Sequence, residues 1–244
     1  MFHWDQFVAK PTPAGQYRAG CDAPTATFER LEFHITTLLP GRTAHPPHFH
    51  PQEELILIKE GQVEARINGQ PLRAGPGSLL FYASRNPHNL TNVGDTPATY
   101  FVFTYFTAAT RAAPAKPATD SVPVGKLRSG VFDWEKLAVT PTETGVRRAI
   151  VDSPTVTLAN FEAHASTLNA GEAVPEHCRA KEEFLIVKEG QLEVMINRVT
   201  QRVGVGSVVF FASNDVRSIR NPGETPATYF IFSAVSDLTP KETH

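Results

Sequence analysis

Short runs of apolar and β-branched residues, separated by glycine, proline and asparagine, recur along the whole chain, which is the pattern of an all-β protein. Polar and apolar side chains alternate over residues 62–67, and Asn68-Gly69 follows directly, which is the strongest short signal for a β-hairpin. Further strands are predicted at 79–82 and 100–105, with counterparts at 208–211 and 229–232. Short strands at this spacing predict a jelly-roll β-barrel, in which closure or a double sheet protects the strand edges.

The chain also repeats itself. Residues 44–105 align with residues 173–234 without a gap, and the clearest block reads EELILIKEGQ at 53–62 and EEFLIVKEGQ at 182–191. The similarity continues upstream with a slip of one residue, because 2–5 matches 132–135 and 31–34 matches 161–164. A repeat of this length predicts two homologous barrels in tandem.

The domain boundaries follow from this repeat. We predict an N-terminal barrel over residues 1–106 and a C-terminal barrel over 130–244. Residues 107–129 between them are rich in Ala, Pro and Thr and lack apolar periodicity, so they are predicted to form a semi-extended linker. The total of 244 residues suits two domains of roughly 110 residues, each large enough for its own core.

Side chains that bind metals gather in the first copy. The chain reads HFHPQEE over residues 48–54, and His88 follows later. Alternate residues of an extended chain share a face, so His48, His50 and Glu54 share one while Glu53 points away, provided that the turn at Pro51 does not reset the alternation. Imidazoles with a carboxylate suit a first-row divalent ion, and the set has too little sulfur for a structural zinc finger and too much nitrogen for calcium. We expect one Fe, Mn, Ni, Co, Cu or Zn ion per chain.

The spacing His-x-His-x3-Glu-x6-Gly, followed by His-x3-Asn at His88 and Asn92, resembles the two motifs of the cupin superfamily. The second motif is looser here: the usual Gly-Asp is Gly77-Ser78, and residues 83–85 read Ala-Ser-Arg where Pro-x-Gly is usual. The resemblance covers nearly the whole chain apart from the linker and implies a two-domain cupin, or bicupin, with two jelly-roll barrels. It also implies that one metal in the first barrel is bound by His48, His50, Glu54 and His88.

The second copy keeps only part of this set. His177 and Glu183 align with His48 and Glu54, but Arg179 replaces His50 and Arg217 replaces His88. A guanidinium has no lone pair for a metal and stays protonated, so the second site is predicted to be metal-free. The two arginines then either pair with Glu183 as a structural ion pair or bind an anionic ligand, a carboxylate or a phosphate.

Other residues are candidates for the pocket wall. His34 and His164 hold equivalent positions beside Glu32 and Glu162, and because the Glu-x-His pair persists in the copy that lost its metal ligands, a structural or interface role is favoured over catalysis. The remaining candidates are His45, Tyr82, Phe101 and Phe103, for which solvated-loop or core-packing roles are the alternatives.

Composition narrows the function. A net charge of −2 gives no electrostatic reason to expect nucleic acid or an anionic membrane, and no apolar run reaches the roughly 20 residues of a spanning helix. Cys21 and Cys178 are the two cysteines, too few for a disulfide framework. The first residues lack the features of a signal peptide, so a cytoplasmic protein is expected unless such a segment has been removed. The sequence leaves open whether two chains pair into a homodimer.

These observations favour a metal-dependent enzyme that acts on a small organic substrate in the first barrel. The apolar aromatic strands favour a dioxygenase-type oxidoreductase with an aromatic or enol substrate. The resemblance also allows an isomerase, a decarboxylase or an amidohydrolase. A non-enzymatic protein that binds a small molecule and uses the metal structurally is the alternative of another class.

Overall fold

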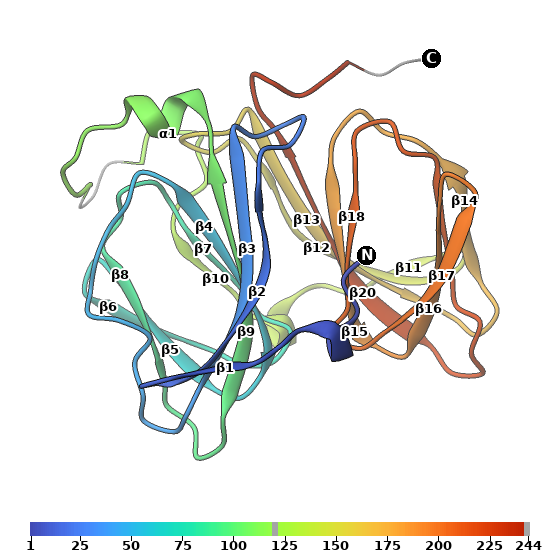
Figure 1. Cartoon of the computed structure of the whole chain (residues 1–244), viewed down its shortest axis with the longest axis horizontal. Helices are drawn as coiled ribbons and strands as arrows, with labels where there is room; N and C mark the ends of the chain where they lie inside the picture. The colour runs from blue at the N-terminus through green and yellow to red at the C-terminus, as the bar shows by residue number, and fades with distance from the viewer. Residues whose placement is uncertain (119–121, 242–244) are drawn as a thin grey trace. The chain divides into compact units, whose positions relative to one another are not determined.

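The computed structural model of the protein describes residues 1–118 and 122–241. Residues 119–121 of the predicted linker and 242–244 of the predicted C-terminal domain lie outside the described residues. The chain divides into two compact units (Figure 1). The first barrel, as we call it, comprises residues 7–136 and 153–158, and the second barrel comprises residues 1–6, 137–152 and 159–244.

The first barrel is built from two antiparallel sheets. The larger sheet contains, in spatial order, β1 (Lys10–Thr12), β2 (Gly15–Ala23), β3 (Arg30–Leu38), β9 (Ala98–Phe106), β4 (Glu53–Glu60), β7 (Leu79–Tyr82) and β10 (Gly130–Phe132). The smaller sheet contains β6 (Gln70–Ala74), β5 (Val63–Ile67) and β8 (His88–Asn92). Apolar side chains of both sheets, among them Ile56, Leu80 and Leu90, form one buried core.

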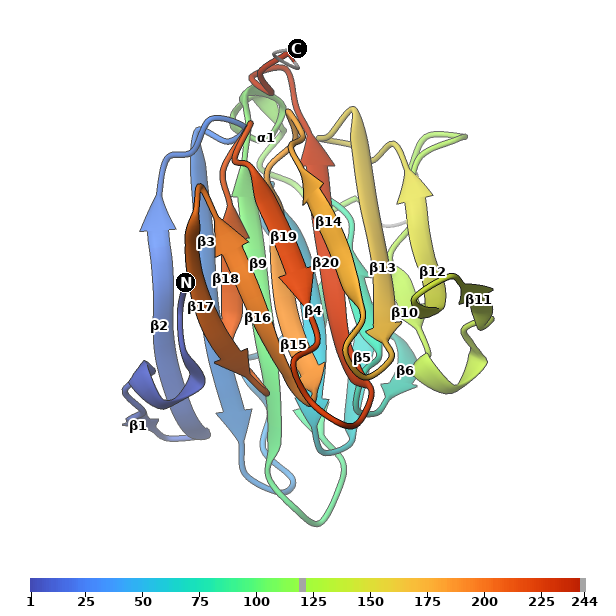
Figure 2. The same ribbon diagram turned by 90° about the vertical axis from the view of Figure 1, so that its right-hand side faces the viewer.

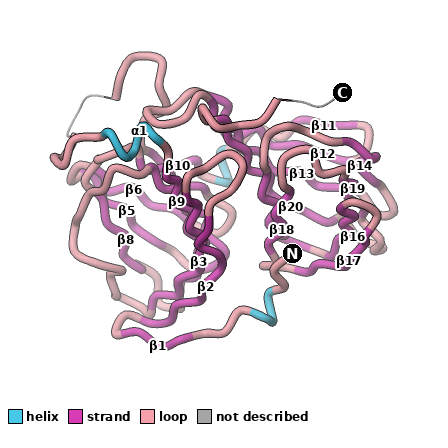
Figure 3. The backbone as a smooth tube through the Cα atoms, turned by 45° about the horizontal axis from the view of Figure 1, so that its top comes forward, coloured by secondary structure: helices cyan, strands magenta, loops and turns pink. Residues whose placement is uncertain are grey.

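The second barrel repeats this plan. Its larger sheet contains β11 (Thr140–Thr142), β12 (Gly145–Ser153), β13 (Asn160–Leu168), β20 (Ala227–Val235), β15 (Glu183–Glu189) and β18 (Val208–Phe211). Its smaller sheet, in front in Figure 2, contains β14 (Ala173–His177), β19 (Arg217–Arg220), β16 (Gln191–Ile196) and β17 (Val199–Gly204). The sequence-based prediction of an all-β protein with two β-barrels is therefore confirmed, and strands dominate both units in Figure 3.

Turn chemistry sets the strand pairing. Asn68 and Gly69 both adopt positive φ, 49° and 82°, so the two-residue turn matches the twist of the strands that it joins, β5 and β6. Asn92, the last residue of the second motif, donates hydrogen bonds to the carbonyl groups of Leu38 and Thr96 and accepts one from the backbone of Gly94. The motif asparagine therefore ties loops together.

Three segments lie in a different unit from the one predicted by their order in the sequence, and one of them is residues 153–158, which belong to the first barrel. Phe2 bridges to Val208 on β18, which places residues 1–6 in the second barrel, and β10 pairs with β7 in the first. These two segments align with each other at the start of the two repeats. The predicted boundaries at 106, 129 and 130 placed residues 1–6 in the first barrel and β10 in the second, whereas the structure has each of them in the other barrel.

The predicted linker is not extended throughout. A short helix, α1, spans Ala108–Ala112, and the Thr107 and Thr110 side chains form a reciprocal capping box at its start. Alanine is the best helix former, so this Ala-rich stretch takes up a helical turn as soon as its first backbone N–H groups are capped. Within the described residues, no helix is both long enough and apolar enough to cross a membrane.

Candidate metal centre

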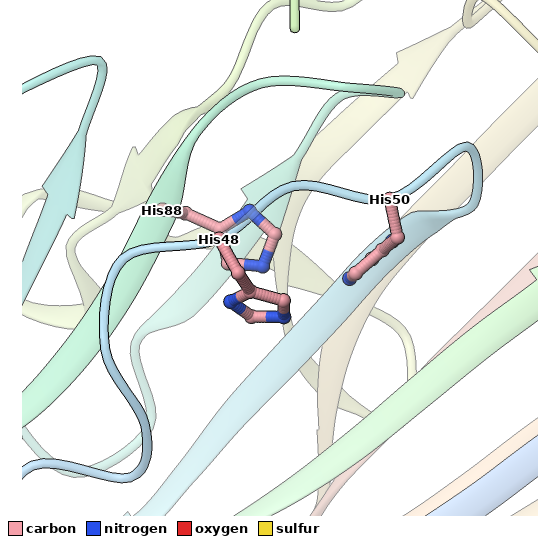
Figure 4. Close-up of side chains that lie close together, drawn as sticks. All are labelled: His48, His50 and His88. Carbon is pink, nitrogen blue, oxygen red and sulfur yellow. The ribbon is translucent and has the colours of Figure 1, made fainter. Parts of the chain in front are cut away.

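Three histidines of the first barrel, His48, His50 and His88, come together at one end of its smaller sheet. Pro46 and Pro47 lack backbone N–H groups and interrupt regular pairing, and His48 then forms a two-way backbone bridge with His88, with N···O distances of 3.1 and 2.9 Å. His50 follows in the same loop, which precedes β4, and His88 opens β8. Figure 4 shows the three imidazoles pointing toward one another.

Their geometry is compact. The nitrogen atoms available for ligation on His48, His50 and His88 all lie within 4.8 Å of one another. Glu54, on β4, lies beside this cluster, since its Oε2 is 3.3 Å from His50 Nε2. The structure thus brings the four side chains of the predicted ligand set to one place.

Glu53 points away from the cluster. Its buried carboxylate accepts hydrogen bonds from the Thr155 hydroxyl, from the Thr157 hydroxyl at 2.7 Å and from the backbone N–H of Val156 at 2.9 Å. These donors lie in the 153–158 segment of the same unit. The carboxylate is therefore fully used in holding this segment against β4, and Glu54 alone of the pair faces the histidines.

Backbone carbonyl groups orient two of the imidazoles. Nδ1 of His50 lies 3.0 Å from the Gln52 carbonyl oxygen, and Nδ1 of His88 lies 2.8 Å from that of Asn86. Because a carbonyl oxygen only accepts, each Nδ1 carries the hydrogen. Nε2 of His88 is therefore left with a lone pair for the cluster. Nε2 of His50 faces the Glu54 carboxylate at 3.3 Å, where a proton on Nε2 hydrogen-bonds to Glu54 and a metal ion would have to replace that proton. Nε2 of His88 and Nδ1 of His48 are buried and lack a hydrogen-bond partner in the described part of the chain. Buried nitrogen atoms without partners, beside a carboxylate, fit a divalent metal ion.

The protonation states agree with this fit. Burial lowers the pKa of His88 to about 4, and burial together with the neighbouring histidines also lowers the pKa of His48, so both imidazoles are neutral at neutral pH. For His50, burial lowers the pKa, but the hydrogen bond and charge of Glu54 outweigh it and raise the value overall. Burial would raise the pKa of Glu54, but the histidines more than offset it and keep the carboxyl ionised.

A cavity of about 1130 Å³ opens beside the cluster. Its wall includes all four predicted ligands and, from the other predicted candidates, His34, His45 and Tyr82. Lining residues that sequence reasoning did not single out include Tyr17, Thr36, Arg42, Gln52, Tyr100 and Val102. Tyr17 packs against His34 with ring centroids 5.0 Å apart, a contact set by the β2–β3 pairing.

Phe101 and Phe103, two candidates for the pocket wall, do not line the cavity and have the core-packing role that was their alternative. Glu54 pairs with Thr104 across the β4–β9 ladder, so Tyr100, Val102 and Thr104 share the cavity face. Phe101 and Phe103 therefore point to the opposite face of the sheet, where both stack on Phe33 at centroid distances of 6.5 and 5.0 Å.

Comparison with known protein families identifies the family of this chain. The model of the cupin domain matches residues 34–104 and again residues 165–233. The chain belongs to the cupin family. It carries two cupin domains, and the predicted resemblance to a two-domain cupin is confirmed.

Individual relatives of this cupin are distant. A segment of 60 residues is 38% identical to dimethylsulfoniopropionate lyase DddQ of Ruegeria pomeroyi. This match covers 24% of this chain and 29% of the lyase. Among solved structures, AerE from Microcystis aeruginosa has a TM-score of 0.70 at 14% identity and matches 96% of this chain and 99% of its own. Oxalate decarboxylase from Lactobacillus farciminis has a TM-score of 0.70 at 16% identity, and the match covers 97% of this chain and 88% of the decarboxylase. A variant of salicylate 1,2-dioxygenase from Pseudoaminobacter salicylatoxidans has a TM-score of 0.65 at 20% identity, and the match covers 86% of this chain and 70% of the dioxygenase. At these identities the structures show the fold alone.

The second domain of this cupin has an ion pair at the equivalent position. The buried Arg217 guanidinium is paired through Nη2 with Glu183, and its Cζ lies 4.9 Å from the centre of the Phe211 ring. Arg179 Nε is 3.8 Å from Glu183 Oε1, but its side chain is 52% exposed. His177 Nδ1 lies 2.9 Å from the Pro175 carbonyl oxygen. Arg217 is therefore the principal partner of the buried carboxylate, and whether these four residues also bind an anion stays a prediction.

Proposed function

We propose that this cupin is a metal-dependent enzyme, a dioxygenase-type oxidoreductase, that acts on a small organic molecule in the first barrel. The observation that carries the proposal is the three-histidine cluster with Glu54 at the wall of a cavity of about 1130 Å³. His48, His50, Glu54 and His88 would hold one first-row divalent ion. Such an ion supplies Lewis acidity and, if it is redox-active, electron transfer with dioxygen.

The residues of the cavity favour an aromatic or enol substrate. Apolar side chains are part of the cavity lining, namely Tyr82, Tyr100, Val102, Ile56 and Leu90. Such surfaces exclude water around the reacting group and orient a flat ring by packing. These walls support a planar organic substrate over a highly charged one.

His34 is assigned a structural role. Its Nδ1 lies 3.5 Å from Glu32 Oε1, and the second barrel keeps the same pair, with His164 Nδ1 3.7 Å from Glu162 Oε1. A pair that persists where no three-histidine cluster exists among the described residues serves the barrel rather than the reaction.

A substrate screen separates the proposed reaction from its alternatives. Metal-loaded protein is incubated with catechols, flavonols, 1,3-diketones and salicylate while dioxygen uptake is recorded, and dimethylsulfoniopropionate and small carboxylic acids are screened for product without oxygen uptake. The proposal predicts oxygen uptake that ends when a chelator removes the metal. Turnover without oxygen uptake would assign a lyase, decarboxylase or isomerase, and a ligand-induced thermal shift without turnover would assign a binding protein.

Metal occupancy is expected to fall on acidification before the barrel unfolds. Because the pKa of His50 is raised, a proton competes for its Nε2 at a higher pH than at an ordinary histidine of about 6.5, whereas His88 stays neutral down to about pH 4. Lowering the pH from 8 to 5 therefore weakens metal binding through His50. Elemental analysis after dialysis against chelator at each pH checks this, and full retention near pH 5 would contradict an exchangeable site.

A further inference from the structure

The hydroxyl group of Tyr82 has no hydrogen-bond partner among the residues that the structure describes. Tyr82 lies on β7 opposite Glu54, its ring stacks on the His88 imidazole with centroids 4.2 Å apart and planes at 14°, and its side chain lines the cavity. The residue is 1% exposed, and within residues 1–118 and 122–241 its buried hydroxyl oxygen makes no hydrogen bond. A buried hydroxyl that makes no hydrogen bond costs stability, so its presence calls for an explanation.

The second barrel shows that the fold does not require this hydroxyl. Phe211 holds the equivalent position, pairs with Glu183 as Tyr82 pairs with Glu54, and lies under the Arg217 guanidinium as Tyr82 lies against His88. The hydroxyl is thus present in the copy with three histidines and missing from the copy with two arginines.

A second tyrosine pair provides the contrast. Tyr100 in the first barrel and Tyr229 in the second are equivalent, and their hydroxyl groups interact with the side chains of Thr36 and Ser166, which partly offsets the rise that burial causes in the pKa of each tyrosine. These hydroxyl groups have an internal partner and are present in both copies. The Tyr82 hydroxyl differs on both counts, which separates it from the shared framework of the barrels.

We propose that the Tyr82 hydroxyl is a substrate-binding group, which donates a hydrogen bond to an oxygen atom of a small molecule bound beside His48, His50 and His88. The ligand class is an oxygen chelator, such as a catecholate or an enolate, and the inference rests on the proposed function. A phenol is protonated at neutral pH, since its ordinary pKa is about 10, so the Tyr82 hydroxyl has a hydrogen to donate.

The thermal stability of the ligand-free protein tests the inference without any substrate. Tyr82→Phe removes a group without a partner and reproduces the residue of the second barrel, so we expect the metal content to be unchanged and Tm to stay or rise by about 2 to 4 °C. Tyr100→Phe removes the interaction of its hydroxyl with Thr36, so its Tm should fall. A fall for Tyr82→Phe as large as that for Tyr100→Phe would show that the hydroxyl has a structural partner, and the inference would be wrong.

The affinity for a chelating ligand is the second test of the role of the Tyr82 hydroxyl. 4-Nitrocatechol, a chelating chromophore, is titrated into metal-loaded wild-type, Tyr82→Phe and Tyr229→Phe protein and followed by absorbance. We expect an affinity about tenfold weaker for Tyr82→Phe, the equivalent of about 1.4 kcal/mol, and no change for Tyr229→Phe. Equal affinities of wild-type and Tyr82→Phe protein would overturn the inference. Absence of binding to wild-type protein that carries its metal would instead contradict the proposed function. The comparison of Tm between Tyr82→Phe and Tyr100→Phe would then be the test of whether the Tyr82 hydroxyl has a structural partner.

Discussion

Replacing His88 by alanine is expected to remove most of the metal from the purified protein. Each imidazole supplies one coordination bond. Removal of a residue that only hydrogen-bonds to a metal ligand already lowers metal affinity roughly 10–100-fold. Loss of His88 itself should cost more, because its Nε2 is buried against the other ligands and no other described side chain of the cluster can replace it. His50→Ala should act alike, and elemental analysis after brief dialysis measures both.

His45→Ala is the matched control for these variants. The His45 ring lies 3.9 Å from the His48 ring between centroids and lines the same cavity, yet His45 is exposed and does not belong to the three-histidine cluster. Its removal should leave the metal content at the wild-type level. Unchanged metal in both His50→Ala and His88→Ala would contradict the ligand assignment.

Arg217→Ala is expected to destabilise the protein by about 3 to 5 kcal/mol. The Arg217 side chain is 1% exposed and its partner Glu183 is 9% exposed. Removal of the guanidinium therefore leaves a buried carboxylate with only the half-exposed Arg179, 3.8 Å away, as compensation. The free energy of unfolding from urea denaturation measures the loss, with the transition of the second barrel followed separately if the two barrels unfold apart.

Arg202→Ala serves as the control for this change. Arg202 also pairs with a glutamate, Glu193, at 2.9 Å, but its side chain is 64% exposed, so solvent screens the pair and the cost should stay below about 1 kcal/mol. Equal, small losses of unfolding free energy for Arg217→Ala and Arg202→Ala would show that the buried pair contributes no more than a surface pair.

The double variant Arg179→His/Arg217→His should recreate a four-ligand set with His177 and Glu183 and raise the metal content toward two ions per chain.

Much of the fold and part of the site could be predicted from the sequence because both rest on local patterns. Alternation along β4 separates Glu54, which faces the histidines, from Glu53, which binds Thr155 and Thr157. The Asn68-Gly69 turn fixes one hairpin. The gap-free repeat indicates two barrels, and the replacement of two histidines by arginines indicates a different chemistry in the second.

The features that the sequence did not reveal depend on contacts between distant strands. Phe101 and Phe103 seemed suitable for a pocket wall, but the pairing of Glu54 with Thr104 turns them to the other face, and local sequence does not contain that register. Tyr17 reaches the cavity only through the β2–β3 pairing. A signal was available for α1, whose Thr107 and Thr110 have the spacing of a capping box in an Ala-rich stretch.

The metal stoichiometry of the purified wild-type chain tests the central claim most directly. Elemental analysis alongside a protein concentration from amino-acid analysis gives ions per chain together with their identity. The account predicts one first-row divalent ion per chain, bound in the first barrel, and none in the second, where Arg217 pairs with Glu183. Two ions per chain, or none after loading with each candidate metal at pH 8, would contradict it.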